Sequence, residues 1–365
     1  MNIGVITNDM PPYSCGIGDH TINLANAIRF AGDSAVIISA RGDPSENIYV
    51  VECDWDQQGL EKLFKKLESL DLDHLILQFT PLMYLNKKNH DGHELQKFWK
   101  KCTLRWSISI IVHETYFRTW WHPPSWINGL LEKQLLKKMV ANSRFAFTAS
   151  QPLVNEMKDW RNNTNVQLLP IGSNFPFVEI DKNKAKEQVD FQNDEIVLLL
   201  FGGGNTLKWI KKYVHATDAL LYSKGIKARW LLLGGVPEAW FKLKLPVSSP
   251  GRLSEQQIST WLQSSDIFLM PHYAGLCAKR GTLMAAMQHA LPVVGTRSKM
   301  TDPFWDEVKG VQLSSLHAAG EFAQQVLALA LNQQLRKHLG RVNQEYFQRH
   351  FTWENIVRSF LEVVK

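Results

Sequence analysis

The stretch "SSPGRLSEQQISTWLQSSDIFLMPHYAGLCAKRGTLMAAMQHALPVVGT", residues 248–296, alternates helix and strand patterns in a way that decides the fold. Apolar residues at helical spacing over 255–263 are followed by the short apolar run 266–270, and the same order repeats over 280–289 and 292–295. Short continuous apolar runs predict buried strands. Buried strands that alternate with helices are typical of a parallel sheet covered on both faces.

The same alternation extends along the rest of the chain and forms two sets. In the first half we expect strands at 3–7, 35–39, 74–78, 108–112, 145–148 and 166–169, and helices at 19–31, 58–69 and 125–142. In the second half we expect further strands at 196–201 and 229–233, and further helices at 206–223 and 318–333. Two such sets predict an α/β protein with two Rossmann-like domains.

The joint between the two sets is expected in "LLPIGSNFPFVEID", residues 168–181, because prolines, a glycine and a Ser-Asn pair follow the last strand of the first set. We therefore expect an N-terminal domain over 1–172 and a C-terminal domain over 173–351. Thr352 is placed to cap an amphipathic final helix, about 352–365, which is expected to pack back on the first domain.

The composition indicates a globular protein, with 45% hydrophobic and 21% charged residues in 365. The four cysteines are scattered, which argues against a disulfide framework or a zinc site. Because no signal peptide or membrane-spanning stretch is evident, we expect a cytoplasmic protein.

The net charge of +6 is unevenly distributed along the chain. Residues 84–161 hold 13 Lys/Arg against 6 Asp/Glu and also six tryptophans, whereas residues 1–83 hold 5 Lys/Arg against 12 Asp/Glu. A basic, tryptophan-rich block suits an anionic membrane surface or a phosphorylated partner, so peripheral association with the inner face of the membrane is one expectation. The alternative is a solvated face with half-buried tryptophans. A nucleic-acid partner is not expected, since no recognition motif accompanies the charge.

Two glycine-rich loops follow expected strands. Gly16 and Gly18 lie just before a helix, whose free N–H groups could receive a phosphate, although the third glycine of the dinucleotide fingerprint is missing. "FGGGNTLKWIKKY", residues 201–213, adds Lys208 to a similar turn but lacks the Gly-Lys-Ser/Thr of a P-loop. The alternative for each loop is a tight turn without a ligand.

A polar pair, His113 and Glu114, follows the strand at 108–112 in the sequence "VHETYFRTWW". In open parallel sheets ligands bind beyond the carboxyl ends of the strands, which makes this pair a candidate for a cleft. The alternative is a structural histidine at a strand end. No metal site is expected, because His90, His93 and His122 lack ligand spacing.

Taken together, several motifs resemble the GT-B fold glycosyltransferases of the large retaining group, family 4. The motifs that carry the resemblance are "PGRLSEQQI", "LQSSDIFLMP" and "LMAAMQHALPVVGT", supported in order along the chain by "PPYSCGIGDHT", "VHE", "LLPIGSN" and "FTWENIV". The resemblance implies two Rossmann-like domains facing across a cleft. It also implies transfer of a sugar from a nucleotide diphosphate donor to an acceptor hydroxyl, with retention of configuration and without a bound metal or cofactor.

On the phosphate and sugar side of the donor, the resemblance implies roles for residues of both halves. Backbone groups of Gly16 and Ile17 would approach the distal phosphate and the reacting sugar. Lys208 would clamp the diphosphate from the loop that contains Gly203, and His113 would lie beside the donor sugar. Such charge stabilisation of a leaving diphosphate usually dominates catalysis of this kind.

On the nucleoside side of the donor, Gly251, Arg252 and Leu253 would frame the base. Gly281 and Thr282 would offer N–H groups to the nearer phosphate at a helix start. The acceptor is expected on the first domain, near the aromatic and basic loops 84–93 and 116–126. The residues assigned to the acceptor side are Asp19, His20, Glu114 and Tyr116.

This sequence departs from the family pattern in two places. The family usually has an arginine directly after the glycine of its "GR…K" loop, whereas Gly203 is followed by Gly204 and Asn205. The family also carries two glutamates eight positions apart, and the register of "ALPVV" puts Cys277 and Ala285 there. Contacts to the sugar and ribose hydroxyls are therefore missing.

Lys279 and Arg280 are a cation pair in an otherwise uncharged loop before the helix at 280–289. We hypothesise that Arg280, or in second place Lys279, replaces the missing clamp arginine. In a first alternative the pair points to solvent or meets Asp266 or Asp302. In a second it binds an acidic donor sugar or a phosphorylated acceptor.

The sequence therefore predicts a hexosyltransferase of polysaccharide or glycolipid synthesis, with UDP-glucose as the first guess for the donor and a saccharide or lipid-linked saccharide as acceptor. One alternative is a catalytically degenerate scaffold or binding subunit of the same fold. Another is a sugar-nucleotide epimerase, which would also need paired carboxylates. A dinucleotide oxidoreductase is disfavoured by the missing fingerprint.

Overall fold

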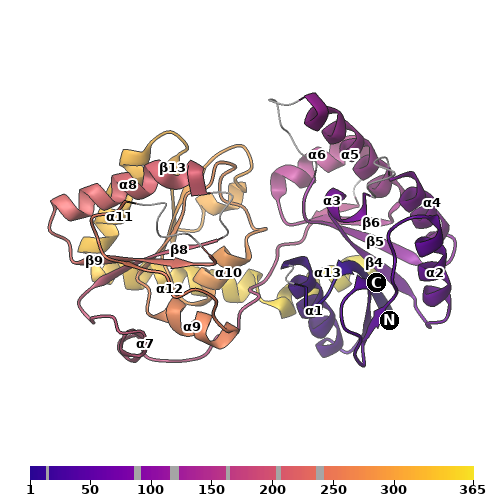
Figure 1. Cartoon of the computed structure of the whole chain (residues 1–365), viewed down its shortest axis with the longest axis horizontal. Helices are drawn as coiled ribbons and strands as arrows, with labels where there is room; N and C mark the ends of the chain where they lie inside the picture. The colour runs from indigo at the N-terminus through magenta and orange to yellow at the C-terminus, as the bar shows by residue number, and fades with distance from the viewer. Residues whose placement is uncertain (14–15, 86–91, 116–122, 162–164, 203–206, 236–241) are drawn as a thin grey trace. The chain divides into compact units, whose positions relative to one another are not determined.

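The computed structural model describes residues 1–13, 16–85, 92–115, 123–161, 165–202, 207–235 and 242–365. The chain divides into two compact units: Met1–Pro170 with Trp353–Lys365, and Ile171–Thr352. Each unit is a parallel sheet covered by helices, and both chain ends lie in the first unit (Figure 1). The expected α/β fold with two Rossmann-like domains is confirmed.

The first unit is built on a sheet whose seven described strands are all parallel, in the order β3-β2-β1-β4-β5-β6-β7. The strands are β1 (Asn2–Asp9), β2 (Ser34–Arg41), β3 (Ile48–Val50), β4 (His74–Phe79), β5 (Ser107–Val112), β6 (Phe145–Thr148) and β7 (Val166–Leu168). The helices are α1 (Gly16–Phe30), α2 (Gln57–Glu68), α3 (Pro81–Tyr84), α4 (His93–Cys102), α5 (Pro123–Asn142), α6 (Gln151–Arg161) and α13 (Trp353–Val364).

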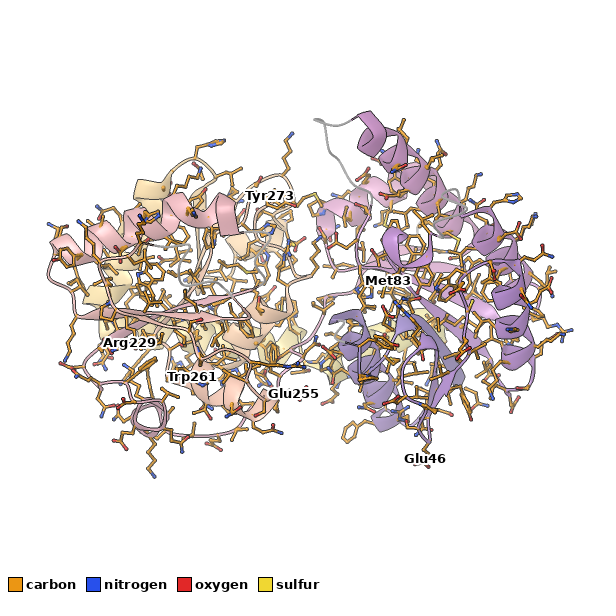
Figure 2. All side chains as sticks on the ribbon, viewed as in Figure 1. Glu46, Met83, Arg229, Glu255, Trp261 and Tyr273 are labelled. Atoms are coloured by element: carbon orange, nitrogen blue, oxygen red, sulfur yellow. The ribbon has the colours of Figure 1, made fainter. Side chains whose placement is uncertain are left out.

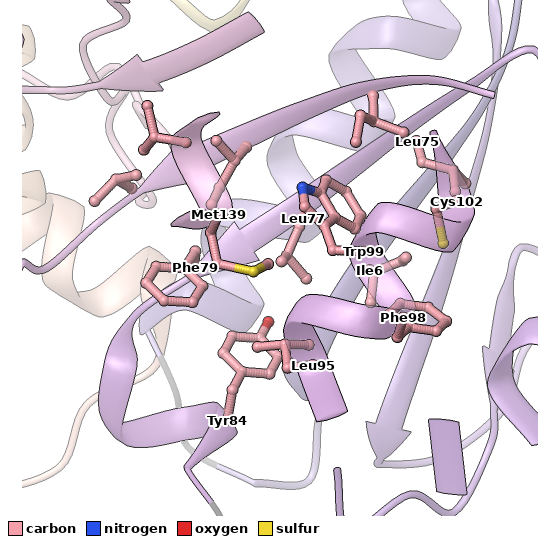
Figure 3. Close-up of a cluster of buried hydrophobic side chains, with 14 of the residues drawn as sticks. Ile6, Leu75, Leu77, Phe79, Tyr84, Leu95, Phe98, Trp99, Cys102 and Met139 are labelled. Carbon is pink, nitrogen blue, oxygen red and sulfur yellow. The ribbon is translucent and has the colours of Figure 1, made fainter. Parts of the chain in front are cut away.

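Successive residues of each strand in the first sheet serve opposite cores, as strand geometry requires. Ile3 and Val5 of β1 join α1 and α13 in one core, whereas Ile6 joins α2 and α4 in the other. Figure 3 shows the second core, in which Trp99 of α4 and Phe79 of β4 are fully buried. The sheet is thus fixed from both faces, and its carboxyl edge is held rigidly.

Helix α13 returns to the first unit at the end of the chain. Its apolar face packs against α1, with Val357 and Phe360 fully buried. The Asp33 carboxylate forms ion pairs with both ends of the chain. Its oxygens lie 2.5 Å from the Met1 amino group and 2.8 Å from Lys365 Nζ. Burial acts to raise the pKa of Asp33, but the hydrogen bonds and charges of Lys365 and the amino terminus outweigh it and lower the pKa.

The second unit contains a parallel sheet with six described strands in the order β10-β9-β8-β11-β12-β13. The strands are β8 (Ile196–Phe201), β9 (Ala228–Leu233), β10 (Val247–Ser248), β11 (Ile267–Met270), β12 (Val293–Arg297) and β13 (Val311–Ser315). The helices are α7 (Lys182–Gln188), α8 (Leu207–Ser223), α9 (Glu255–Gln263), α10 (Gly281–Gln288), α11 (Ala319–Leu331), α12 (Gln333–His350) and the 3-10 turn η3 (Pro303–Asp306).

Every strand expected from the sequence is present, and three more were not expected. These are the edge strands β3, β10 and β13. β3 and β10 have only three and two residues, and β13 reads Val-Gln-Leu-Ser-Ser, so none shows a long apolar run. Edge strands are half-exposed and therefore carry a weaker hydrophobic signal than the central strands.

Close packing of α12 on the loop before β12 leaves no room at Gly340. A Cβ there would lie 1.9 Å from the carbonyl oxygen of Ala290, which is backbone and cannot step aside. Gly320 in α11 has nothing within 4 Å of its Cβ position. We predict that Gly340→Ala lowers the free energy of unfolding by about 1–3 kcal/mol through overpacking.

Gly320→Ala is the matched control and should stabilise the fold by up to about 1 kcal/mol, because alanine is the better helix former. Urea denaturation of both variants measures the difference. A Gly340→Ala protein as stable as the parent would show that α12 can shift away from Ala290.

Candidate functional site

The carboxyl edge of the first sheet is centred on His113, which directly follows β5. The backbone N–H of His113 donates to the carbonyl of Phe79, the last residue of β4, at 2.9 Å. Its Nε2 lies 2.5 Å from Oε1 of Gln78, a fully buried residue of β4. Because an amide oxygen only accepts, this contact places the imidazole proton on Nε2. The ring is half-buried and fixed in orientation at a strand end.

His20 reaches the same place from α1 and packs edge-on against His113, with ring centroids 4.8 Å apart. Its other neighbour is Trp353 of α13, at 5.1 Å. His20 is 4% exposed, and burial together with the charge of a protonated His113 lowers its pKa well below the usual value. His20 is therefore neutral at pH 7, and its buried ring packs against the ring of His113.

The start of α1 carries the other residues that the sequence assigns to the first unit. Gly16 begins the helix and is exposed, Ile17 is half-buried, and Asp19 is exposed. Thr21 Oγ1 donates to the carbonyl of Ile17 at 2.7 Å and so stiffens this first turn. Of the remaining residues, Glu114 follows His113 and is exposed, whereas Tyr116 lies outside the described residues.

In the second unit, the turn after β10 is formed by Gly251, Arg252 and Leu253. Gly251 has φ +79°, a conformation that favours glycine, and Arg252 is exposed. Leu253 packs partly against the core, and Ser254 then caps α9 through a capping box with Gln257. The turn is therefore fixed by Gly251 on one side and by the capping of α9 on the other, and Arg252 between them is exposed to solvent.

The loop after β8 is only partly described. Lys208 lies in the first turn of α8, and both Gly203 and the side chain of Lys208 lie outside the part of the chain that the structure describes. The clamp that the sequence predicts from Lys208 thus stays a prediction.

Arg280 lies in the loop that follows the carboxyl end of β11, directly before α10, and contacts His272. Its Nη2 is 2.9 Å from His272 Nε2, while the Ala274 N–H points at Nδ1 of the same ring at 3.1 Å. A neutral imidazole has one lone pair in the ring plane, so it cannot accept both hydrogen bonds. Nε of Arg280 is buried and has no hydrogen-bond partner among the described residues. Arg280 is thus incompletely satisfied.

His272 is 6% exposed and remains neutral at pH 7. Burial, then the charges of Arg280 and Lys279, lower its pKa to about 3. Tyr273, labelled in Figure 2, stacks on the ring with centroids 4.6 Å apart and is itself 55% exposed. Neutral His272 therefore contacts Arg280 without neutralising its charge, and Arg280 retains N–H groups that have no acceptor among the described residues.

Helix α10 starts directly after this cation pair. The N–H groups of Gly281 and Thr282 make no hydrogen bond within the described residues, and Arg280 at the cap position gives none from its side chain. Free N–H groups at a helix start attract anions. Both residues, like Lys279, are half-buried and remain accessible.

Cys277 and Ala285, which stand where the sequence resemblance predicts glutamates, are both fully buried. Burial raises the pKa of the Cys277 thiol, so it is a neutral apolar side chain. Asp302 is tied to this loop through Oδ2, which accepts the Ala278 N–H at 2.7 Å. Asp266, the other carboxylate considered for the cation pair, binds Lys182 and Lys186 instead.

The structure thus assembles two groups of the expected residues, one at the carboxyl edge of each sheet. Reasoning from the sequence missed Gln78 and His272, which orient His113 and Arg280. Gln78 is a polar residue within the apolar strand "HLILQF", and His272 follows "IFLMP" directly. A polar residue at the carboxyl end of a buried strand is the signal that could have found both.

Within the described part of the chain, no group of three or more His, Cys, Asp or Glu side chains could hold a metal ion. None of the described helices is long and apolar enough to cross a membrane.

Residues 195–332, within the second unit, match the family model described as "Glycosyl transferases group 1". No curated protein matches the chain by sequence. The second unit therefore contains a glycosyltransferase group 1 domain, and its matched region spans the loops of Gly251 and Arg280.

Solved structures with the same fold cover essentially the whole chain. Sucrose-phosphate synthase from Thermosynechococcus elongatus has a TM-score of 0.73 at 14% identity, covering 99% of this chain and 98% of its own. WaaG, a glycosyltransferase involved in lipopolysaccharide biosynthesis, has a TM-score of 0.71 at 11% identity (100% and 99% covered). Anabaena HepE, in complex with UDP and glucose, gives 0.69 at 11% identity (100% and 99% covered). The fold is that of GT-B glycosyltransferases.

Proposed function

We propose that this chain, whose second unit contains a glycosyltransferase group 1 domain, transfers a hexose from a nucleotide diphosphate donor with retention of configuration and without a metal ion. The first guess for the donor is UDP-glucose. The acceptor is a saccharide or lipid-linked saccharide of polysaccharide or glycolipid synthesis. The solved structures of similar fold include a complex with UDP and glucose, which supports this choice.

One observation carries the proposal. Arg280 stands immediately before the N–H groups of Gly281 and Thr282, which find no acceptor among the described residues, and Nε of Arg280 finds none there either. A guanidinium fork beside a helix start is suited to an oxygen-rich dianion such as a diphosphate. In this proposal Arg280, with Lys208 and Lys279, stabilises the charge that develops on the leaving diphosphate.

The first unit contributes His113 to the same reaction. Its ring contacts Gln78 and packs against neutral His20, so it keeps one orientation.

In the proposal His113 lies beside the donor sugar, and Gly16 and Ile17 approach the distal phosphate. Asp19, Glu114 and Tyr116 belong to the acceptor side, whereas His20, which was also expected there, is buried against His113 and acts through that ring. The base lies against Gly251, Arg252 and Leu253.

The lipid-linked acceptor would bring the chain to a membrane surface. The described part of the basic block includes exposed Lys100 and Lys101 on α4 and Leu104, which is 83% exposed. Cations beside an exposed apolar side chain favour an anionic membrane surface. We therefore include cytoplasmic, peripheral association with the inner leaflet in the proposal.

A thermal-shift screen with UDP, GDP and ADP and their common sugars tests the donor. A nucleotide at 100 times its dissociation constant adds about 2.7 kcal/mol of stability and raises the melting temperature. The configuration of the product, followed by NMR with and without EDTA, then tests the mechanism. An α-linked product from UDP-α-glucose supports retention, whereas a β-linked product or a requirement for metal would contradict it.

A catalytically degenerate binding subunit is the second candidate. The buried Cys277 and Ala285 favour it, because neither can replace a glutamate that binds hydroxyls. If no nucleotide raises the melting temperature and no donor hydrolysis is detected, the chain is the binding subunit and not the transferase.

A further inference from the structure

A cavity of about 540 Å³ opens at the amino edge of the second sheet. Its lining includes Ile196, the first residue of β8, and Asp266 and Pro292, which directly precede β11 and β12. The loop of Arg280 follows the opposite, carboxyl end of β11. The cavity is therefore separate from the proposed donor site, and its size is typical of small-molecule sites.

Positive charge dominates the lining. The described lining residues include five cations, Lys182 and Lys186 of α7 and Arg336, Lys337 and Arg341 of α12, against the carboxylates of Asp194 and Asp266. Lys182 and Lys186 are four residues apart, as are Lys337 and Arg341, so each of these pairs lies on one face of its helix. Asp194 is already paired with Lys227, at 2.6 and 2.7 Å.

Asp266 is shared by three of these cations. Its carboxylate lies 2.8 Å from Lys182 Nζ, 3.0 Å from Lys186 Nζ and 3.8 Å from Arg336 Nε. Burial acts to raise the pKa of Asp266, but Lys182 and Lys186 outweigh it and lower the pKa, so the group is ionised. One carboxylate cannot balance three cations, and Lys186 is only 2% exposed. Excess positive charge in such a place is costly unless an anion compensates it.

Several of the cations keep open hydrogen-bond donors. Arg336 uses Nη1 on the carbonyls of Leu329 and Ala330, at 2.7 and 2.9 Å, and its Nη2 makes no hydrogen bond within the described residues. Lys337 makes neither a hydrogen bond nor an ion pair within them, and Arg341 has only Glu345 at 3.6 Å. Lys337 and Arg341 are four residues apart on α12, where like charges repel.

The cavity lining also includes an aromatic ring and several amides. Phe177 is 43% exposed, and its ring packs against His289 with centroids 5.1 Å apart. The amides of Asn183, Gln333 and Gln344 also line the space. An aromatic ring and amides beside a cation cluster are the groups that bind the ring, the hydroxyls and the phosphate of a sugar phosphate.

We propose that this cavity binds a phosphorylated sugar, with its phosphate among Arg336, Lys337 and Arg341 and its ring against Phe177. The site goes beyond the proposed glycosyl transfer, because it lies at the other edge of the sheet and does not depend on the donor loops. A bound sugar phosphate would reduce the repulsion between Lys337 and Arg341 on α12 and would stabilise the packing of α7 near α12.

Calorimetric titration with glucose 6-phosphate tests the proposal, with inorganic phosphate and glucose as separate arms. Saturating UDP is present throughout, so that the donor loops are not free to bind the probe. Lys337→Ala/Arg341→Ala should weaken binding of glucose 6-phosphate at least about tenfold, since two charge-assisted contacts are lost. Both side chains are exposed, so the fold is retained.

The charge-matched control is Lys224→Ala/Lys309→Ala, which removes two exposed cations outside the cavity and should leave the affinity unchanged. Arg280→Ala should also leave it unchanged, because Arg280 belongs to the donor loops. Phe177→Ala should weaken binding of glucose 6-phosphate but not of inorganic phosphate.

Four results would overturn the proposal: no binding of glucose 6-phosphate, equal affinity for glucose 6-phosphate and inorganic phosphate, the same loss in the control pair as in the cavity pair, or loss of binding in Arg280→Ala. None of these depends on whether the chain transfers sugar, so failure of this site and failure of the proposed function are distinguishable.

Discussion

Arg280→Ala is expected to reduce turnover with the nucleotide-sugar donor by about 10²–10³-fold while leaving the fold intact. The reason is the position of Arg280 before the first N–H groups of α10, because neither these groups nor Nε of Arg280 has a hydrogen-bond partner in the described part of the chain. A cation held there can stabilise charge that develops on a leaving diphosphate, and the family's usual arginine is missing from the loop after β8. Steady-state kinetics, together with UDP affinity by calorimetry, measures the loss.

Two further variants sharpen this test. Arg280→Lys keeps the charge but loses the planar fork, so it should recover only part of the rate. Lys309→Ala removes an exposed cation of the same unit away from the site and should leave turnover unchanged.

NMR titration of His272 reports whether the local geometry is as described. Arg280 is one of the charges that lower the pKa of His272 to about 3, so this pKa should rise in Arg280→Ala although burial continues to hold it down. If that pKa rises and turnover stays near normal, Arg280 contacts His272 as described but takes no part in the reaction.

The fold could be predicted because the central strands are continuous apolar runs. "IVLLLF" in β8 and "IFLM" in β11 are buried from both sides, and short apolar runs of this kind are typical of the interior of a covered parallel sheet. The edge strand β10, two half-buried residues long, has no comparable pattern. Its place follows from pairing with β9, a tertiary contact that local sequence does not encode.

The site could be predicted only in part, for a related reason. His113 and Arg280 stand out because they follow apolar strands or interrupt an uncharged loop. Their partners Gln78 and His272 become visible only when β4 is paired with β5 and when the loop after β11 is folded. The cation cluster around Asp266 was missed because α7 and α12 are about 150 residues apart in the chain and meet only in the folded unit.

The second large effect concerns stability. Asp266→Ala is expected to lower the free energy of unfolding of the second unit by about 3–5 kcal/mol, the typical cost of removing one partner of a buried ion pair. The carboxylate is 5% exposed and contacts Lys182 and Lys186, and its Oδ2 also accepts the Val197 N–H at 2.9 Å. Without it, the buried Lys186 ammonium loses its ionic partner in a place that water hardly reaches.

Asp194→Ala is the matched control, since Asp194 lines the same cavity but its side chain is 70% exposed and pairs with Lys227 at the surface. It should leave stability nearly unchanged, because exposed ion pairs contribute little. Urea denaturation followed by tryptophan fluorescence, to which the buried Trp230 and Trp305 of the second unit contribute, measures the two variants side by side. A loss below about 1 kcal/mol in Asp266→Ala would mean that the carbonyls around Lys186 suffice to hold its charge, and the case for excess positive charge in the cavity would fall with it.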